Sequence, residues 1–135
     1  MSGKGPIVLF VCEHGSAKST IAAAQFNKLA RERNLNAHGI SRGTDPDETY
    51  PPNVTEGLRR DGLHAEESTP KKLSDADLAT AARVVVFNQQ PSVRSNNSVI
   101  HDWSDVPAVS EDYDLASNEI LRRVKSVIND LYPRE

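Results

Sequence analysis

Cysteine is nearly absent from this sequence, which has a single one, Cys12, among 135 residues. One cysteine cannot form a disulfide within the chain, so a disulfide-stapled fold is excluded. In a reducing compartment a lone thiol is either a buried core residue or a reactive nucleophile. The surroundings of Cys12 therefore decide how the sequence is interpreted.

Long charged runs and long apolar runs are also missing. The net charge is −3, from 16 basic and 19 acidic residues, without the basic blocks that bind a nucleic-acid backbone. No apolar run approaches a bilayer span, and residues 1–6 lack the arrangement of a secretory signal. We therefore expect a cytoplasmic protein that binds neither nucleic acid nor membrane. Its length favours a single domain over residues 1–135.

Metal ligands and aromatic residues are sparse as well. The four histidines share no recognised metal-ligand spacing and fall on different predicted elements, so no metal is expected. Aromatic residues make up 5% of the chain. Trp103 and the run Val84–Phe87 are better explained as core than as a recognition surface.

Apolar runs rich in β-branched residues predict the strands. Ile7–Val11 and Arg83–Phe87 are continuous, which is typical of strands covered on both faces. Weaker runs predict strands at 36–41 and 99–103, with a polar loop over 88–98 before the last one.

Apolar residues spaced three and four apart predict helices between these strands. Helices are expected over 19–33, 53–61 and 111–131, and Ser74 with Asp77 predicts the capping box of a further short helix. Asn34 and Gly62 stand where two of the helices should stop. Alternating strands and helices predict an α/β fold of three layers (αβα), with a four-stranded parallel sheet and right-handed crossovers.

The segment after the first strand predicts the functional site, because ligands bind beyond the carboxyl ends of strands in such sheets. If residues 13–18 curl around an oxyanion, their amides and the following helix N-terminus form a positive, concave site that favours a thiolate at Cys12. Gly15 tolerates a left-handed backbone, and Ser16 and Ser19 can donate hydrogen bonds to the sulfur or the anion. This pattern suits covalent catalysis through sulfur. In the alternative interpretation, Cys12 is simply the last residue of a buried strand, and Gly15, Ser16 and Ser19 are turn and cap residues.

Several motifs together resemble the low-molecular-weight protein tyrosine phosphatase superfamily, which also contains arsenate reductases. The resemblance covers nearly the whole chain and implies the phosphatase-I-like form of the αβα fold. The Trp and Asp-x-Pro-Ala elements are more similar to the arsenate reductase branch. The motifs are VLFVCEHGSAKS, ISRGT, PKKL, RVVVF and HDWSDVPA.

The resemblance implies roles for individual residues, because the family loop reads Cys, five residues, Arg, Ser. It implies Cys12 as the nucleophile, Ser19 as the support of its thiolate, and Lys18 in the arginine position. Asp105 is the nearest candidate for the general acid, with Asp102, Glu111 and Asp112 as weaker substitutes. The implied oxyanion cradle consists of Glu13, His14, Gly15, Ser16, Ala17 and Lys18.

The sequence departs from the family pattern at the loop. Lys18 supplies charge but cannot present the two-pronged donor of an arginine. Arg42, in the turn after the second strand, is a candidate to replace that donor, and otherwise a solvated turn residue. His14 and Gly15 stand where the family places Gly and Asn. His14 beside a thiolate would titrate near neutrality and stabilise it, and otherwise is an exposed loop histidine.

A further departure displaces the general-acid motif by one residue, to Asp105-Val106-Pro107. The chain also lacks a second cysteine, so a cascade between cysteines of the same chain is impossible.

The motifs leave the reaction open. The leading hypothesis is a cofactor-independent phosphatase or arsenate-reductase-like enzyme that attacks a phosphate-like oxyanion, free or on a phosphorylated substrate, through Cys12. A reductase would need an external thiol such as glutathione or mycothiol. The few aromatic residues offer no evident platform for a phosphotyrosine ring. The alternative is an oxyanion-binding protein of the same fold with impaired catalysis, and a purely structural Cys12 is the third interpretation.

Overall fold

The computed structural model describes residues 5–87 and 99–133, so the predicted polar loop over 88–98 lies outside the described residues. Its strands form one sheet in the order β2-β1-β3-β4, with every neighbouring pair parallel. The predicted four-stranded parallel sheet is confirmed. The second strand begins and ends two residues later than predicted. The bounds are β1 Ile7–Cys12, β2 His38–Gly43, β3 Arg83–Val86 and β4 Val99–Asp102.

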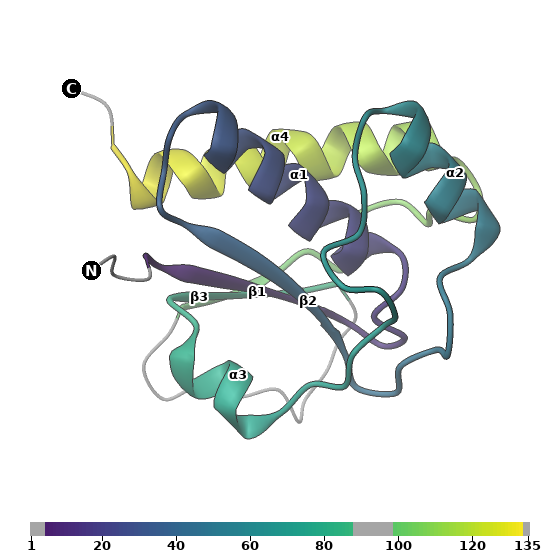
Figure 1. Ribbon diagram of the computed structural model, residues 1–135, viewed down its shortest axis with the longest axis horizontal. Coiled ribbons are helices and arrows are strands. Elements are labelled where there is room, and N and C mark those ends of the chain that lie inside the picture. The colour runs from purple at the N-terminus through teal and green to yellow at the C-terminus, as the bar shows by residue number, and fades with distance from the viewer. Residues whose placement is uncertain (1–4, 88–98, 134–135) are drawn as a thin grey trace.

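The helices cover both faces of this sheet. Helices α1, α2 and α4 lie on one face and α3 on the other, which gives the three predicted layers (Figure 1). The predicted ends of the three longer helices agree with the observed ones to within about two residues, the usual uncertainty of helix ends. The bounds are α1 Lys18–Glu32, α2 Pro52–Arg60, α3 Asp75–Thr80 and α4 Tyr113–Leu131.

The helix signals of the sequence act as predicted. Asn34 has a positive φ of 56° just after α1, and Gly62 a φ of 75° just after α2, the left-handed conformation typical of helix ends. Ser74 accepts a hydrogen bond from the Asp77 amide, and the Asp77 carboxylate accepts one from the Ser74 amide. This reciprocal pair is the predicted capping box of α3.

An aromatic cluster in the core holds the segment between β4 and α4 beside β1. Trp103 is 7% exposed, and its ring centroid lies 6.1 Å from that of Phe10 and 5.6 Å from that of Phe87. Burying rings of this size stabilises the fold by a few kcal/mol each, about 1.5–3 by area. The prediction that Trp103 and Val84–Phe87 belong to the core is confirmed. Trp103 thereby fixes the start of residues 103–110, a segment whose last three residues line the cavity described below.

Among the described residues, no helix is both long enough and apolar enough to cross a membrane. The same residues contain no cluster of three or more His, Cys, Asp or Glu side chains arranged to hold a metal ion.

Candidate active site

Cys12 is the last residue of β1, an internal strand of the sheet, and its sulfur contacts a chain of hydroxyl groups. Its Sγ lies 2.9 Å from Ser19 Oγ, and Ser41 Oγ donates to Ser19 Oγ over 2.8 Å. Because Ser41 supplies the proton on that side, the single hydroxyl proton of Ser19 is free to point at the sulfur. Cys12 and Ser19 are 6% and 0% exposed. The arrangement places a hydroxyl donor against the sulfur, which stabilises a thiolate there.

Residues 13–18, hereafter the Cys12 loop, press against the end of β2 through two glycines. Gly15 has a φ of 61°, and a Cβ at that position would lie 2.7 Å from the Gly43 amide nitrogen. A Cβ on Gly43 would likewise lie 2.7 Å from the Gly15 nitrogen. The predicted left-handed conformation of Gly15 is therefore present, and the loop curls only because neither residue has a side chain.

The loop carbonyls turn outward. The amides of Thr44, Asp45 and Asp47 donate to the carbonyls of Cys12, Glu13 and His14 over 3.3, 2.7 and 3.1 Å. The Gly15 carbonyl accepts from Thr20 Oγ1 at 3.1 Å.

The loop amides consequently turn inward. In a trans peptide the C=O and the next N–H point in opposite directions, so the amides of residues 14–16 point away from these partners. The described residues supply no hydrogen-bond partner for the amides of residues 14–17. Helix α1 adds to this set, because its N-cap, Ala17, has no side-chain cap. A row of unpaired donors at a helix N-terminus is an anion-binding arrangement.

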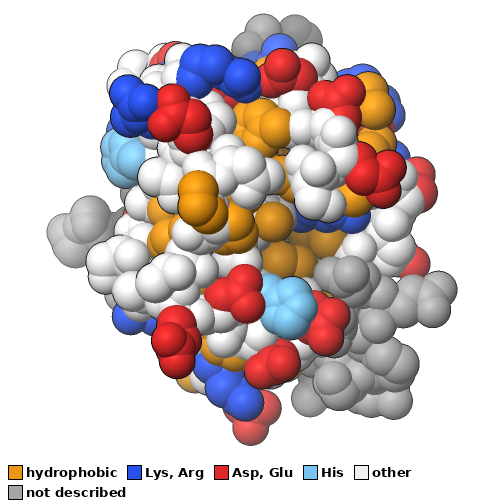
Figure 2. Space-filling view, turned by 90° about the vertical axis from the view of Figure 1, so that its right-hand side faces the viewer, with side chains coloured by type: hydrophobic (Ala, Val, Ile, Leu, Met, Phe, Trp, Pro, Cys, Tyr) orange, Lys and Arg blue, Asp and Glu red, His pale blue; other side chains and the backbone are white. Residues whose placement is uncertain are grey.

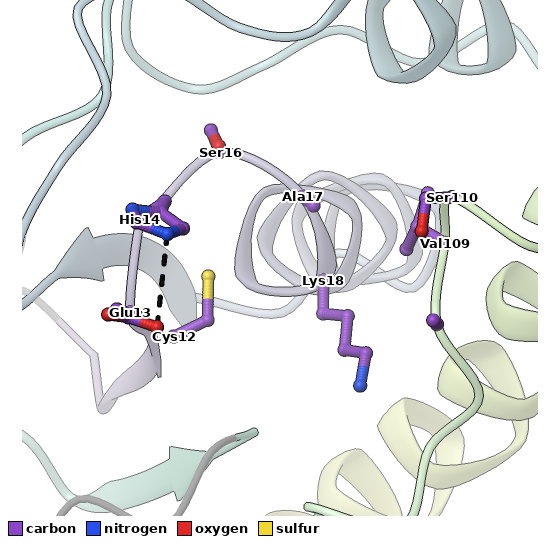
Figure 3. Close-up of a pocket in the computed structure, with 9 residues that line it drawn as sticks. Cys12, Glu13, His14, Ser16, Ala17, Lys18, Val109 and Ser110 are labelled. Carbon is purple, nitrogen blue, oxygen red and sulfur yellow. Dashed lines mark ion pairs between the residues drawn. The ribbon is translucent and has the colours of Figure 1, made fainter.

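A cavity of about 290 Å³ lies over the sulfur, and most residues of the Cys12 loop line it. In Figure 3 the Cys12 sulfur lies between His14 and the start of α1, while Val109 and Ser110 form the opposite wall. The cavity is large enough for a tetrahedral oxyanion with a small group attached. Its lining residues are Cys12, Glu13, His14, Ser16, Ala17, Lys18, Ala108, Val109 and Ser110.

Lys18 lines this cavity, but its amine is engaged elsewhere. The side chain runs away from the sulfur (Figure 3), and Nζ donates to the Val106 carbonyl over 2.7 Å. Partial burial lowers the pKa of the amine, and the charges of Cys12 and Asp105 oppose that shift. Lys18 thus ties residues 103–110 to the Cys12 loop and brings a positive charge near the cavity.

Comparison with known proteins identifies the family. The sequence model of the low molecular weight phosphotyrosine protein phosphatases matches residues 7–125, which is most of the chain and includes the whole Cys12 loop. The chain belongs to this family. Curated protein sequences contain no significant match.

Solved structures similar to this family member include both phosphatases and arsenate reductases. YfkJ from Bacillus subtilis superposes with a TM-score of 0.81 at 20% identity, covering 96% of this chain and 97% of that one. A low molecular weight protein tyrosine phosphatase from T. tengcongensis superposes with a TM-score of 0.78 at 20% identity, covering 93% of this chain and 99% of that one. A thioredoxin-dependent arsenate reductase from Corynebacterium glutamicum gives 0.78 at 22%, covering 97% of this chain but only 64% of that one. At these identities the likeness shows the phosphatase-like fold alone.

Asp105, the predicted general acid of this phosphatase-family chain, is held outside the cavity wall. Both carboxylate oxygens accept hydrogen bonds from Arg123, at 2.8 and 2.9 Å, and the side chain is 73% exposed. These bonds, with the charges of Arg123 and Lys18, hold the pKa of the carboxyl below its usual range. Asp105 is therefore ionised in this arrangement, and a proton donor there would first have to leave Arg123.

Arg42, the other predicted cation, is not brought into the site. Its guanidinium donates to Asp77 at 3.1 Å and to the Ser41 carbonyl at 2.8 Å, and lies 3.5 Å from Glu67. Along a strand, successive side chains point to opposite faces, and Ser41, one residue earlier, faces Ser19. Arg42 therefore faces α3, on the other side of the sheet from Ser19, and does not replace the missing loop arginine.

Sequence reasoning missed three contributors to the site. Ser41 could have been found from the register, since it lies two residues before Gly43, the partner of Cys12 in the parallel ladder. Asp47 and the wall at residues 108–110 carry no such signal, because their positions depend on how two long connections pack.

Proposed function

We propose that this chain binds a phosphate-like oxyanion in the Cys12 loop and that the Cys12 thiolate attacks its central atom. The observation that carries the proposal is the inward row of unpaired amides over a sulfur hydrogen-bonded from below. Donors placed in advance around the position of developing negative charge are what an attack on a tetrahedral anion requires.

With a phosphate ester, Cys12 Sγ would form the S–P bond as the ester P–O bond breaks and the leaving oxygen takes the electron pair. Water would then attack phosphorus, release inorganic phosphate and regenerate the thiolate. Asp105 is the proposed source of a proton for the leaving oxygen, but only once it is free of Arg123. While that ion pair holds, we expect turnover to be limited to esters with good leaving groups.

With arsenate, the first step would form an S–As bond and release water. An external thiol, such as glutathione or mycothiol, would then attack Cys12 Sγ, so that arsenic leaves with the electron pair as arsenite and a mixed disulfide remains. A second external thiol would reduce that disulfide and restore Cys12. The likeness of the HDWSDVPA segment to the reductase branch supports this version of the reaction.

A catalytically impaired oxyanion-binding protein is the second candidate. It is favoured by two contacts: Lys18 Nζ on the Val106 carbonyl and Asp105 on Arg123. Both groups would have to change partners to act on a bound anion.

The experiment that tests the proposal incubates the purified chain with p-nitrophenyl phosphate, quenches with acid and records the intact mass. We expect a phosphoryl adduct on the wild type that maps to Cys12 and is absent from Cys12→Ser. Arsenate with glutathione is assayed in parallel by arsenite release. If phosphate binds but neither substrate gives an adduct or product, the impaired binder is the correct candidate. Turnover that persists in Cys12→Ser overturns the proposed role of the sulfur.

A further inference from the structure

The connection after β2 holds the Cys12 loop from outside with side chains as well as with its backbone. Ser16 Oγ donates to Asp47 Oδ2 over 2.7 Å. His14 Nδ1 donates to the Asp45 carbonyl over 3.0 Å and lies 3.6 Å from Asp47 Oδ1. The two oxygens of one carboxylate thus reach the residues on either side of Gly15.

This contact matters because Gly15 has no side chain with which to fix its own peptides. The two peptides that flank Gly15 carry the amides of residues 15 and 16, and rotation of these peptides would turn both amides away from the cavity. Ser16 is 2% exposed, and its single hydroxyl proton is used in the bond to Asp47. Ser16 is therefore a tether of the loop rather than a hydroxyl donor to the anion.

We propose that Asp47 is a positioning residue of the oxyanion loop, whose carboxylate fixes Ser16 and His14 and thereby keeps the loop amides aimed into the cavity. The inference rests on the proposed function. It assigns a role to a residue 35 positions after Cys12 that touches neither the sulfur nor the cavity.

The contacts of Asp45 and Asp47 with His14 and Ser16, hereafter the clamp, also affect how the site responds to pH. The group that titrates is His14. The acidic groups that face this imidazole are Asp47 and Glu13, with the Asp45 carbonyl on Nδ1. The hydrogen bond to the Asp45 carbonyl is the main cause of a raised pKa of His14; desolvation opposes it, and the charges of Asp47, Glu13 and Asp45 add to it. Figure 2 shows the face at the carboxyl ends of the strands, where acidic side chains gather beside an apolar hollow.

The sign of the pH effect follows from the raised pKa. Charged His14 binds the clamp more strongly and adds positive charge to the cavity wall. Its contribution is complete below the unfolded-state pKa of about 6.5 and is lost as pH rises through the higher folded-state pKa. Without the Asp47 charge, the loss should begin at lower pH.

Isothermal titration with inorganic phosphate tests the role of Asp47 between pH 5.5 and 8.5, comparing the wild type with Asp47→Ala and Asp47→Asn. At each pH the affinity of a variant for phosphate is divided by that of the wild type, so the effect of the titration of phosphate itself cancels. Glu48→Gln is the matched control, since it removes the neighbouring charge from a side chain that makes no ion pair or hydrogen bond to a described residue.

We expect Asp47→Ala to weaken phosphate binding about tenfold throughout this range, as for loss of a charged hydrogen bond. Asp47→Asn keeps an oxygen acceptor for Ser16, so its affinity for phosphate should stay near that of the wild type at low pH. Because the charge beside His14 is lost, the decline of affinity with rising pH should begin at a lower pH than in the wild type. Glu48→Gln should follow the wild-type curve. If the wild type binds phosphate and Asp47→Ala binds it equally well with the same pH profile, the role of Asp47 is wrong while the proposed function stands. If the wild type binds no phosphate at any pH, the proposed function itself fails.

Discussion

Gly43→Ala should reduce phosphate affinity by at least about tenfold, although Gly43 lies on β2 and does not line the cavity. The new Cβ would sit 2.7 Å from the Gly15 nitrogen, 2.8 Å from the His14 carbonyl carbon and 3.0 Å from the Glu13 carbonyl oxygen. All three are backbone atoms, so the clash can be relieved only by separating the Cys12 loop from the end of β2. Overpacking of this kind destabilises a fold by about 1–3 kcal/mol, and here the displacement falls on the amides that face the anion.

The matched control is Gly39→Ala, on the same strand. There a Cβ would meet Phe26 side-chain atoms at 3.1 and 3.2 Å, within the core and away from the loop. Thermal unfolding should show both variants destabilised, whereas isothermal titration should show phosphate affinity lost only in Gly43→Ala. Equal affinity in the two variants would mean that the contact between Gly15 and Gly43 does not shape the site.

Lys18→Arg should raise phosphatase activity, with kcat/KM for p-nitrophenyl phosphate increasing about tenfold or more. Lysine offers a point charge, and in this structure that charge is placed on the Val106 carbonyl. An arginine could keep one N–H on that carbonyl and still present two others to the oxygens of the anion. A single well-placed donor to a developing oxyanion is worth about 2.7–4 kcal/mol in other enzymes, so a tenfold gain requires only part of that.

Lys18→Met tests the charge of Lys18 and its contact with Val106 together. It removes both the positive charge and the bond to Val106 while keeping an unbranched side chain, so phosphate binding should weaken and residues 103–110 should loosen. Steady-state kinetics and phosphate titration on the two variants give the comparison. If neither variant changes affinity or rate, residue 18 is only part of the wall, and its contact with Val106 does not limit catalysis.

The sequence specified the fold well because its signals were local. Asn34, Gly62 and the Ser74 capping box each act within one turn of chain, and the β-branched runs mark strands that are buried on both faces. The position of Cys12 followed from the same rules, since a strand, a loop and a helix in a parallel sheet leave few alternatives.

The contacts around the loop were not predictable in this way. Ser16 and His14 meet the segment at Asp45–Asp47, 31 to 33 residues later, and Asp105 meets Arg123 across 18 residues. Sequence spacing does not encode such pairs, because they depend on the angle at which a connection crosses the sheet edge. Arg42 differs from these pairs, because alternation along β2, which is a local rule, places it on the face opposite Ser41.

Protection of Cys12 from alkylation is the most direct measurement of whether the loop holds an anion over the sulfur. The folded chain is treated with iodoacetamide at neutral pH, with increasing phosphate or, as the ionic-strength control, chloride, and the modified fraction is read by intact mass. We expect Cys12 to alkylate faster than a free thiol, and phosphate, but not chloride, to slow the reaction saturably. Alkylation at the rate of a free thiol, unchanged by saturating phosphate, would contradict an oxyanion site at Cys12.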